Sequence, residues 1–226
     1  MSGPLLVLLP GLGADARLFE PQRVDFPELL CPPWPEPNRN ESLASFARRI
    51  AADIPRDRPL VLGGASMGGM LASEMASLLK PAALVLIGSC TAPSAIARPV
   101  RWVGACGGFV PSAIAELSRP MTPLLLRALG PMRGEDRALL AQMAQGASFA
   151  FMRWAGRATL AWEGAAEPGC RVVRIHGDRD RIVPLSDPER CEVIRGAGHV
   201  PNLSHAGEVN TVLRRVMNEC EAEQDD

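Results

Sequence analysis

Apolar residues along this chain follow two alternating patterns. Short runs rich in leucine, valine and isoleucine alternate with segments in which apolar residues recur at helical spacing. Such runs are typical of strands buried on both faces of a parallel sheet, and helical spacing is typical of the helices that cover the sheet. The chain therefore predicts an α/β fold with a mostly or fully parallel sheet of about six strands.

Six short segments have the apolar character of strands: residues 5–9, 29–31, 60–63, 83–87, 172–176 and 191–194. Three further segments, 42–54, 67–79 and 208–219, place their apolar residues on one helical face. The helix over 67–79 is expected to end at Lys80, because Pro81 follows and the residue before a proline avoids helical backbone angles.

The stretch from 91 to 167 differs from the rest of the chain, because it contains no strand-like run. It carries helical segments interrupted by prolines, and it holds three of the four tryptophans. The prolines are Pro111, Pro120, Pro123 and Pro131. We expect a helical lid inserted between two strands of one α/β domain that spans residues 1–226, with the core formed by 1–90 and 168–226.

Composition is that of a globular protein with no bulk attraction to nucleic acid. The 226 residues are 47% hydrophobic and 22% charged, which is enough apolar material for a core. The 24 basic and 25 acidic residues leave a net charge of −1, which excludes nucleic-acid binding driven by overall charge. No apolar run approaches the roughly 20 residues of a membrane span, so no membrane partner is expected.

The cysteines and the N-terminus predict a cytoplasmic protein. The six cysteines are widely spaced and form no CxxC pair, which is typical of free thiols in a reducing compartment. The apolar run at 5–9 is too short for a signal peptide, and no basic residue precedes it.

A G-x-S-x-G motif is the strongest candidate for chemistry. Gly64, Ser66 and Gly68 form it between the expected strand 60–63 and the expected helix 67–79. A serine on such a sharp turn has strained backbone angles, so the residues two positions away must be glycine. The helix behind it directs free N–H groups at a developing anion. Ser66 is therefore the candidate nucleophile; the simpler alternative is an inert serine in a glycine-rich turn.

A nucleophilic serine needs a base, and the chain offers three histidines. His199 lies in a glycine-containing loop just after the last expected strand, where a side chain can reach over the sheet edge. His176 lies near the end of a strand, and His205 precedes the final helix. We expect His199 to be the base, His176 to be a packed or hydrogen-bonded strand-end residue, and His205 to lie on the surface.

The turn after His176 offers two carboxylates, Asp178 and Asp180, to orient the base. At this point the chain resembles the α/β-hydrolase family, whose catalytic order is Ser, Asp, His. In that family the acid usually stands three residues after a glycine that ends its strand. Asp180 has this spacing from Gly177, so the resemblance implies Asp180 as the acid. Asp178 is then expected to be a turn residue that bonds its own backbone.

The same resemblance implies an oxyanion hole. The family forms it from the amide after the nucleophile and from an amide in an H-G-x-G loop after the first central strand. The donors here would be the backbone N–H groups of Met67 and Leu12. The chain departs from the family at Pro10, which replaces the usual histidine, and at its N-terminus, which lacks the usual antiparallel hairpin.

The activity that the resemblance implies is a carboxylesterase-like serine hydrolase, which cleaves an ester or thioester of a small to medium apolar acid. Neither a cofactor nor a metal is implied. Dehalogenation is disfavoured, because that branch of the family has an aspartate where this chain has Ser66. The main rival from another class is a ligand-binding protein on the same fold, with a slow or vestigial triad.

Two weaker alternatives follow from short patterns. The segment 11–16 mimics the G-x-G-x-x-G/A fingerprint of dinucleotide-binding proteins. His176, Asp178 and Asp180 alternate, so on an extended strand they would share one face as metal ligands.

The expected lid is more basic than the rest of the chain. From 93 to 163 there are eight arginines and four acids, which gives +4. The simpler interpretation is a solvated helical surface. The alternative is that these charges steer an anionic substrate, such as an acyl-CoA or an acyl group on a carrier protein, to the site.

Overall fold

The computed structural model describes residues 3–98 and 126–225, and its centre is a parallel sheet. The strands are β1 (Leu5–Leu9), β2 (Leu60–Ala65), β3 (Ala83–Ile87), β4 (Arg171–Gly177) and β5 (Glu192–Ile194). They lie in the order β1-β2-β3-β4-β5, and every neighbouring pair is parallel. The predicted α/β fold with a parallel sheet is confirmed.

The described sheet has five strands, one fewer than expected. The segment at 29–31 forms only a single bridge, between Leu30 and Val7, beside β1. Pro32 and Pro33 follow directly, and a proline has no N–H with which to continue a ladder. The sixth strand therefore ends after one residue pair.

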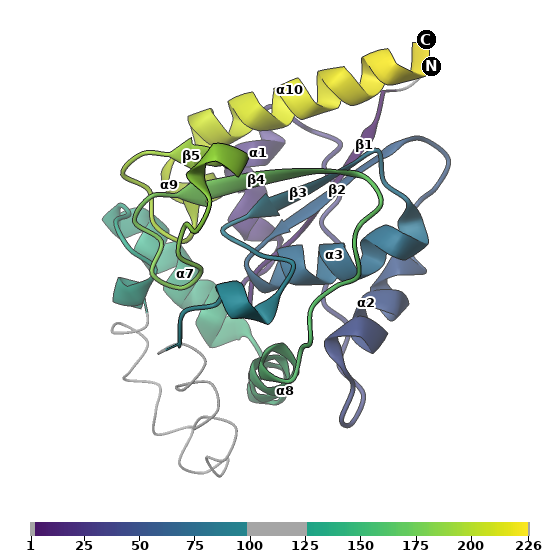
Figure 1. Ribbon diagram of the computed structural model, residues 1–226. Coiled ribbons are helices and arrows are strands. Elements are labelled where there is room, and N and C mark those ends of the chain that lie inside the picture. The colour runs from purple at the N-terminus through teal and green to yellow at the C-terminus, as the bar shows by residue number, and fades with distance from the viewer. Residues whose placement is uncertain (1–2, 99–125, 226) are drawn as a thin grey trace.

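Helices cover both faces of the sheet. On one face lie α2 (Leu43–Ala51) and α3 (Met67–Leu79), and on the other lies α10 (Ala206–Asp225) (Figure 1). Strands β1, β2 and β3 are buried along their whole length, and alternate residues pack into two separate cores, one on each face of the sheet. In β1, Val7 joins the core with α2 and α3, whereas Leu8 joins the core with α10. This arrangement explains why these strands are apolar at every position.

Shorter helices complete the connections. After β1 come η1 (Ala16–Phe19) and α1 (Glu20–Arg23), after β3 comes η2 (Pro93–Ala95), before β5 comes η4 (Pro188–Arg190), and before α10 comes α9 (Pro201–Ser204). None of the helices in the described ranges combines the length and the apolar composition needed to cross a bilayer.

In the described part of the stretch where a lid is expected, two α-helices follow η2 between β3 and β4. They are α7 (Gly134–Gly146) and α8 (Phe149–Leu160). Leu140 of α7 packs in the core on the α10 side, whereas Phe151 of α8 packs in the core on the α2–α3 side. The pair therefore straddles one end of the sheet. Residues 99–125 of the expected lid, with Pro111, Pro120 and Pro123, lie outside the described residues.

An aromatic cluster fixes α8 against α2. Phe46 of α2 lies 4.3 Å, between ring centroids, from Trp154 of α8, and Phe151 lies 5.9 Å from Trp34. Offset and tilted rings at such distances attract each other with an energy beyond that of burying their surface.

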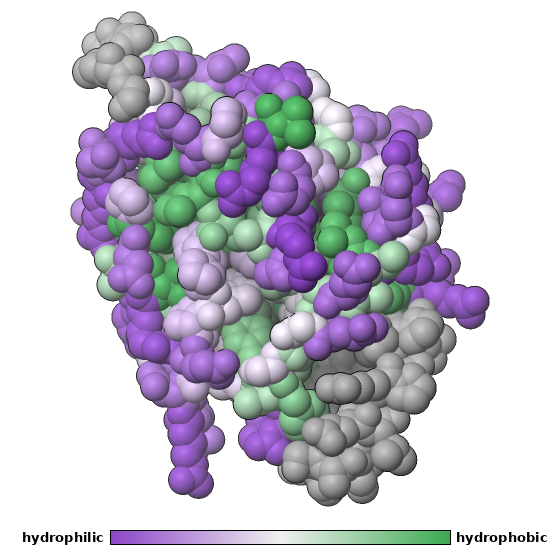
Figure 2. All heavy atoms as spheres, turned by 180° about the vertical axis from the view of Figure 1, so that it is seen from behind, coloured by the Kyte–Doolittle hydropathy of each residue, from purple (hydrophilic) through white to green (hydrophobic). Residues whose placement is uncertain are grey.

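Hydrophilic and hydrophobic residues are intermixed on the face of the molecule seen from behind (Figure 2).

Candidate active site

Ser66 stands on the turn between β2 and α3, as the sequence predicts. Its backbone angles are φ 52° and ψ −121°, which few residues other than glycine adopt. A methyl group on Gly68 would collide with the carbonyl oxygens of Leu9 and Pro10, and one on Gly64 would collide with the backbone of Gly68. The two motif glycines therefore let the turn pack directly against the end of β1.

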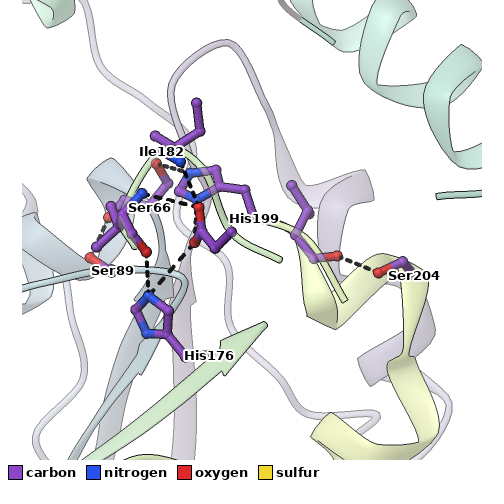
Figure 3. Close-up of polar contacts among 9 residues, drawn as sticks. Ser66, Ser89, His176, Ile182, His199 and Ser204 are labelled. Atoms are coloured by element: carbon purple, nitrogen blue, oxygen red, sulfur yellow. Dashed lines mark hydrogen bonds and ion pairs between the residues drawn. The ribbon is translucent and has the colours of Figure 1, made fainter. Parts of the chain in front are cut away.

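The structure brings Ser66, His199 and Asp180 together. The Nε2 atom of His199 lies 2.9 Å from the Oγ atom of Ser66, and its Nδ1 atom lies 2.8 Å from the Oδ2 atom of Asp180 (Figure 3). The three residues come from three different loops at one end of the sheet. The side chains of His199 and Asp180 are 4% and 0% exposed, so water does not compete for their contact.

Backbone groups hold the base and the acid. The Oδ1 atom of Asp180 accepts hydrogen bonds from the amides of Ile182, at 2.8 Å, and Val183, at 3.0 Å. The amide of His199 donates to the carbonyl of Leu129, at 2.7 Å, so the segment leading to α7 secures the base. Both oxygens of the buried Asp180 therefore have donors, as a buried carboxylate requires.

The neighbouring carboxylate, Asp178, has a different role from the one expected. Its Oδ1 atom accepts from the amide of Gly196 at 2.7 Å, so it bridges to the loop after β5 instead of bonding its own backbone. The residue that stabilises its own turn is Asp180. The expectation for Asp178 was wrong because the turn brings its carboxylate within reach of the Gly196 amide, 18 residues away in the chain.

The other two histidines lie apart from Ser66. His176 is 4% exposed, and its Nε2 atom lies 2.7 Å from the carbonyl oxygen of Val183, so it is the hydrogen-bonded strand-end residue that the sequence predicts. Its Nε2 atom also lies 3.6 Å from the Oδ2 atom of Asp180, a proximity that the sequence analysis missed. His205 is half-buried instead of exposed, and its Nδ1 atom lies 2.9 Å from the Oγ atom of Ser204.

The two amides named for an oxyanion hole both lie beside Ser66. Met67 is the first residue of α3, and the loop that carries Leu12 passes so close that a Cβ atom on Gly11 would lie 3.4 Å from the Cβ atom of Ser66. Neither amide donates to an acceptor in the described part of the chain.

Ser66 and His199 open onto a cavity of about 290 Å³. Its walls come from the loop after β1, from α3, from the segment before α7, and from α7, α8 and the Asp180 turn. Thr159 is the only other polar side chain among the described lining residues, and no charged side chain is found among them. The cavity is therefore suited to an apolar group.

A second, larger groove of about 830 Å³ also borders α8. Arg153 and Arg157 line this groove, whereas Gly156, Thr159 and Leu160 line the cavity at Ser66. The described arginines of α8 are therefore not part of the wall of the cavity at Ser66.

The metal and dinucleotide alternatives do not fit the geometry. Within the described ranges, no three histidine, cysteine or acidic side chains cluster as metal ligands, and Asp178 turns away from His176 and Asp180. The glycine loop leads into η1, a 3₁₀ helix of four residues capped by Asp15, and not into the long helix on which a pyrophosphate rests.

A buried thiol near the site is unsuited to compete as a nucleophile. Burial raises the pKa of the Cys90 thiol to about 11, so it stays protonated at neutral pH. The described cysteines, Cys31, Cys90, Cys170, Cys191 and Cys220, are all free.

Comparison with known proteins places this geometry in a family. The sequence profile of the alpha/beta hydrolase family matches residues 6–212. No curated protein matches the sequence of the chain.

Solved structures share the fold over almost the whole chain. A thermophilic esterase from Thermogutta terrifontis superposes with a TM-score of 0.77 at 17% identity, covering 97% of this chain and 91% of its own. An epoxide hydrolase from Bacillus megaterium gives 0.72 at 14% identity, covering 96% and 94%. A meta-cleavage product hydrolase from Pseudomonas fluorescens gives 0.70 at 18% identity, covering 96% and 92%. These neighbours differ in chemistry, so the likeness shows the fold alone.

Proposed function

Because the chain belongs to the alpha/beta hydrolase family, we propose that it is a serine hydrolase that cleaves a carboxylic ester or thioester of a small to medium apolar acid. One observation carries the proposal. Ser66 Oγ lies within hydrogen-bond distance of a histidine whose other ring nitrogen contacts a buried carboxylate. This is the arrangement that activates a hydroxyl group as a nucleophile.

The reaction follows from these contacts. His199 Nε2 takes the Ser66 proton as Oγ forms a bond to the acyl carbon. The bond to the alcohol or thiol then breaks, and His199 returns the proton to the leaving group. Next, His199 removes a proton from water, whose oxygen attacks the acyl-enzyme. The bond between the acyl carbon and Ser66 Oγ then breaks, His199 returns its proton to Oγ, and the acid is released. Asp180 keeps the His199 proton on Nδ1 and stabilises the charged ring.

The amides of Leu12 and Met67 stabilise the oxyanion of each tetrahedral intermediate. They are backbone donors held in place before the substrate arrives, so no reorganisation is needed when the negative charge develops. The first helical position of Met67 adds the positive end of the α3 dipole.

The cavity supports the choice of acyl group. A volume of about 290 Å³ is at the lower end for ligand pockets, and its apolar lining favours an acid without charge or many polar groups. We propose that α7 and α8 belong to a lid spanning 91–167 and close this cavity on one side. No described arginine lines it, so the acyl part bound there is neutral, and an anionic or carrier-bound substrate is disfavoured.

A panel of p-nitrophenyl esters of increasing acyl length, run beside matching acyl-thioesters, tests the function. We expect turnover that rises with chain length and then falls once the cavity is full. Ser66→Ala should abolish turnover and labelling by a fluorophosphonate while the protein remains folded by circular dichroism. Turnover that survives in Ser66→Ala would refute the proposal, and saturable ligand binding with no turnover would support the binding-protein alternative instead.

A further inference from the structure

We propose that His176 is a positioning residue that holds Asp180 in line with His199. This inference rests on the proposed function, in which Asp180 orients the base. It assigns a role to a buried histidine that the reaction itself does not use.

His176 and His199 approach the same carboxylate oxygen from two sides. The Oδ2 atom of Asp180 lies 2.8 Å from Nδ1 of His199 and 3.6 Å from Nε2 of His176. Figure 3 shows the two labelled histidines on different sides of the contact network that includes Ser66. The Asp180 side chain is fully buried, so donors around it are the only compensation for its lost hydration.

The hydrogen bond to Val183 fixes the tautomer of His176. A carbonyl oxygen only accepts, so Nε2 of His176 must carry a proton to bond the Val183 carbonyl at 2.7 Å. Nδ1 of His176 is buried without a partner, so a proton there would be left unpaired. The Nε2 atom that bonds Val183 lies 3.6 Å from Oδ2 of Asp180, which is too far for a hydrogen bond, so His176 acts on Asp180 through the Val183 backbone.

Both backbone polar groups of Val183 form hydrogen bonds to side chains. Its amide donates to Oδ1 of Asp180 at 3.0 Å, and its carbonyl accepts from His176 at 2.7 Å. His176 belongs to β4, which is paired with β3 and β5, so its backbone is rigid. The turn that carries Asp180 is thereby tied back to the strand that it leaves. The turn is also tied to other segments at Arg179 and Ile182, whose backbone groups bond Ala197 and Ala97, but among the described contacts His176 is the one that fixes the Val183 carbonyl.

Two replacements separate the donor from the volume of the ring. His176→Phe fills the space without a donor, and His176→Gln keeps an amide N–H. We expect His176→Phe to lower kcat for a p-nitrophenyl ester on the order of 10- to 100-fold, because small misplacements of catalytic groups are costly. KM should change less than about twofold, since the substrate cavity does not include His176. His176→Gln should recover most of the rate, and His205→Phe, the matched control, should retain it.

A double-mutant cycle shows whether the effect passes through Asp180. In an Asp180→Asn background, His176→Phe should cost less than about twofold in kcat, because the group that it positions is already disabled. An equal loss in both backgrounds would mean that His176 acts only on general stability and would overturn the proposal. If His176→Phe does not fold, His176→Leu serves as the donor-free variant.

A measurement that needs no substrate distinguishes failure of this proposal from failure of the proposed function. The Nδ1–H proton of His199, bonded to Asp180, should give a low-field proton NMR resonance in the wild type and in His176→Gln. In His176→Phe this resonance should move upfield or broaden through exchange with water. An unchanged resonance would overturn the positioning role even if the protein turned over no ester, whereas a shifted resonance in a protein without turnover would reject only the serine hydrolase.

Discussion

The turn after β2 and the turn after β4 deliver side chains to the same point but are held by different forces. At Ser66 the backbone is locked by packing, because two glycines let the turn press against the carbonyl oxygens at the end of β1. At Asp180 close packing also occurs, because Gly177 lies against the carbonyl oxygens of Ala197 and Gly198, but hydrogen bonds to the Asp180 carboxylate hold the turn as well. The nucleophile is thus positioned by backbone packing, whereas the acid also depends on hydrogen bonds to its own side chain in a dry environment.

The difference teaches which changes each region tolerates. A steric lock fails when an atom is added, and a hydrogen-bonded turn fails when a donor or acceptor is removed. Substitutions in the two turns should therefore separate loss of stability from loss of activity. The predictions below begin with the largest expected effect.

Removing the base should have the largest effect on rate. His199→Ala leaves Ser66 without a proton acceptor, so kcat for a p-nitrophenyl ester should fall by at least about 10⁴-fold. His205→Ala should stay within about twofold, because His205 bonds Ser204 and not Ser66. Steady-state kinetics of both variants provide the measurement. Equal losses would mean that the base has been assigned to the wrong histidine.

Substitution of the two aspartates by asparagine should have different effects on the rate of turnover, but not on stability. Asp180→Asn supports the wrong tautomer of His199 and should cost about 10³- to 10⁴-fold in kcat. Asp178→Asn keeps an oxygen that can accept from the Gly196 amide, so it should change kcat less than about twofold and stability by less than about 1 kcal/mol. Kinetics and thermal melts of the pair check this. A large rate loss in Asp178→Asn alone would exchange the two roles.

An added methyl group in the turn at Ser66 should lower the stability of the protein. Gly68→Ala places a methyl group against the backbone at the end of β1, and we expect a loss of about 3 kcal/mol in the free energy of unfolding. Gly156→Ala is the matched control, because it lies inside α8 with nothing within 4 Å of the added atom. It should stabilise the protein by about 0.5–1 kcal/mol. Urea unfolding of both variants decides, and a neutral Gly68→Ala would show that the turn is not sterically locked.

The contrast between the two turns also explains what the sequence could predict. The surroundings of Ser66 depend on neighbours close in the chain, so Gly64, Gly68 and the strand–helix boundary indicate the turn directly. The spacing from Gly177 pointed to Asp180 through the resemblance to the α/β-hydrolase family. The contact between His176 and Asp180 depends on how the turn folds back onto β4, and no spacing rule describes that. Their separation of four residues across a glycine was the available signal, and it entered only as part of the weaker metal alternative.

The boundaries of the sheet were less predictable for a related reason. The run at 29–31 is apolar, because Leu29 and Leu30 pack beside β1, but the two prolines after it prevent further pairing. The apolar character of a segment indicates that it is buried, whereas the length of a strand depends on backbone N–H groups that can bond the neighbouring strand. The basic charge of the stretch 93–163 posed a similar problem, because net charge does not say whether the arginines line the cavity at Ser66 or another groove.

The position of those arginines leads to the smallest expected effect. Arg153 and Arg157 line the larger groove beside α8, and Arg133 pairs with Glu135 at 3.5 Å, and none of the three lines the cavity that contains Ser66. Salt screens attraction between exposed charges, so a steering effect would weaken as ionic strength rises. We expect kcat/KM for a neutral ester and for an anionic thioester of the same acyl chain to change less than about twofold between about 10 mM and 500 mM salt. The substitution of both Arg153 and Arg157 by Gln should leave this flat response unchanged. A steep fall for the anionic substrate alone would mean that the basic stretch recruits it, and the proposed neutral substrate would then have to be abandoned.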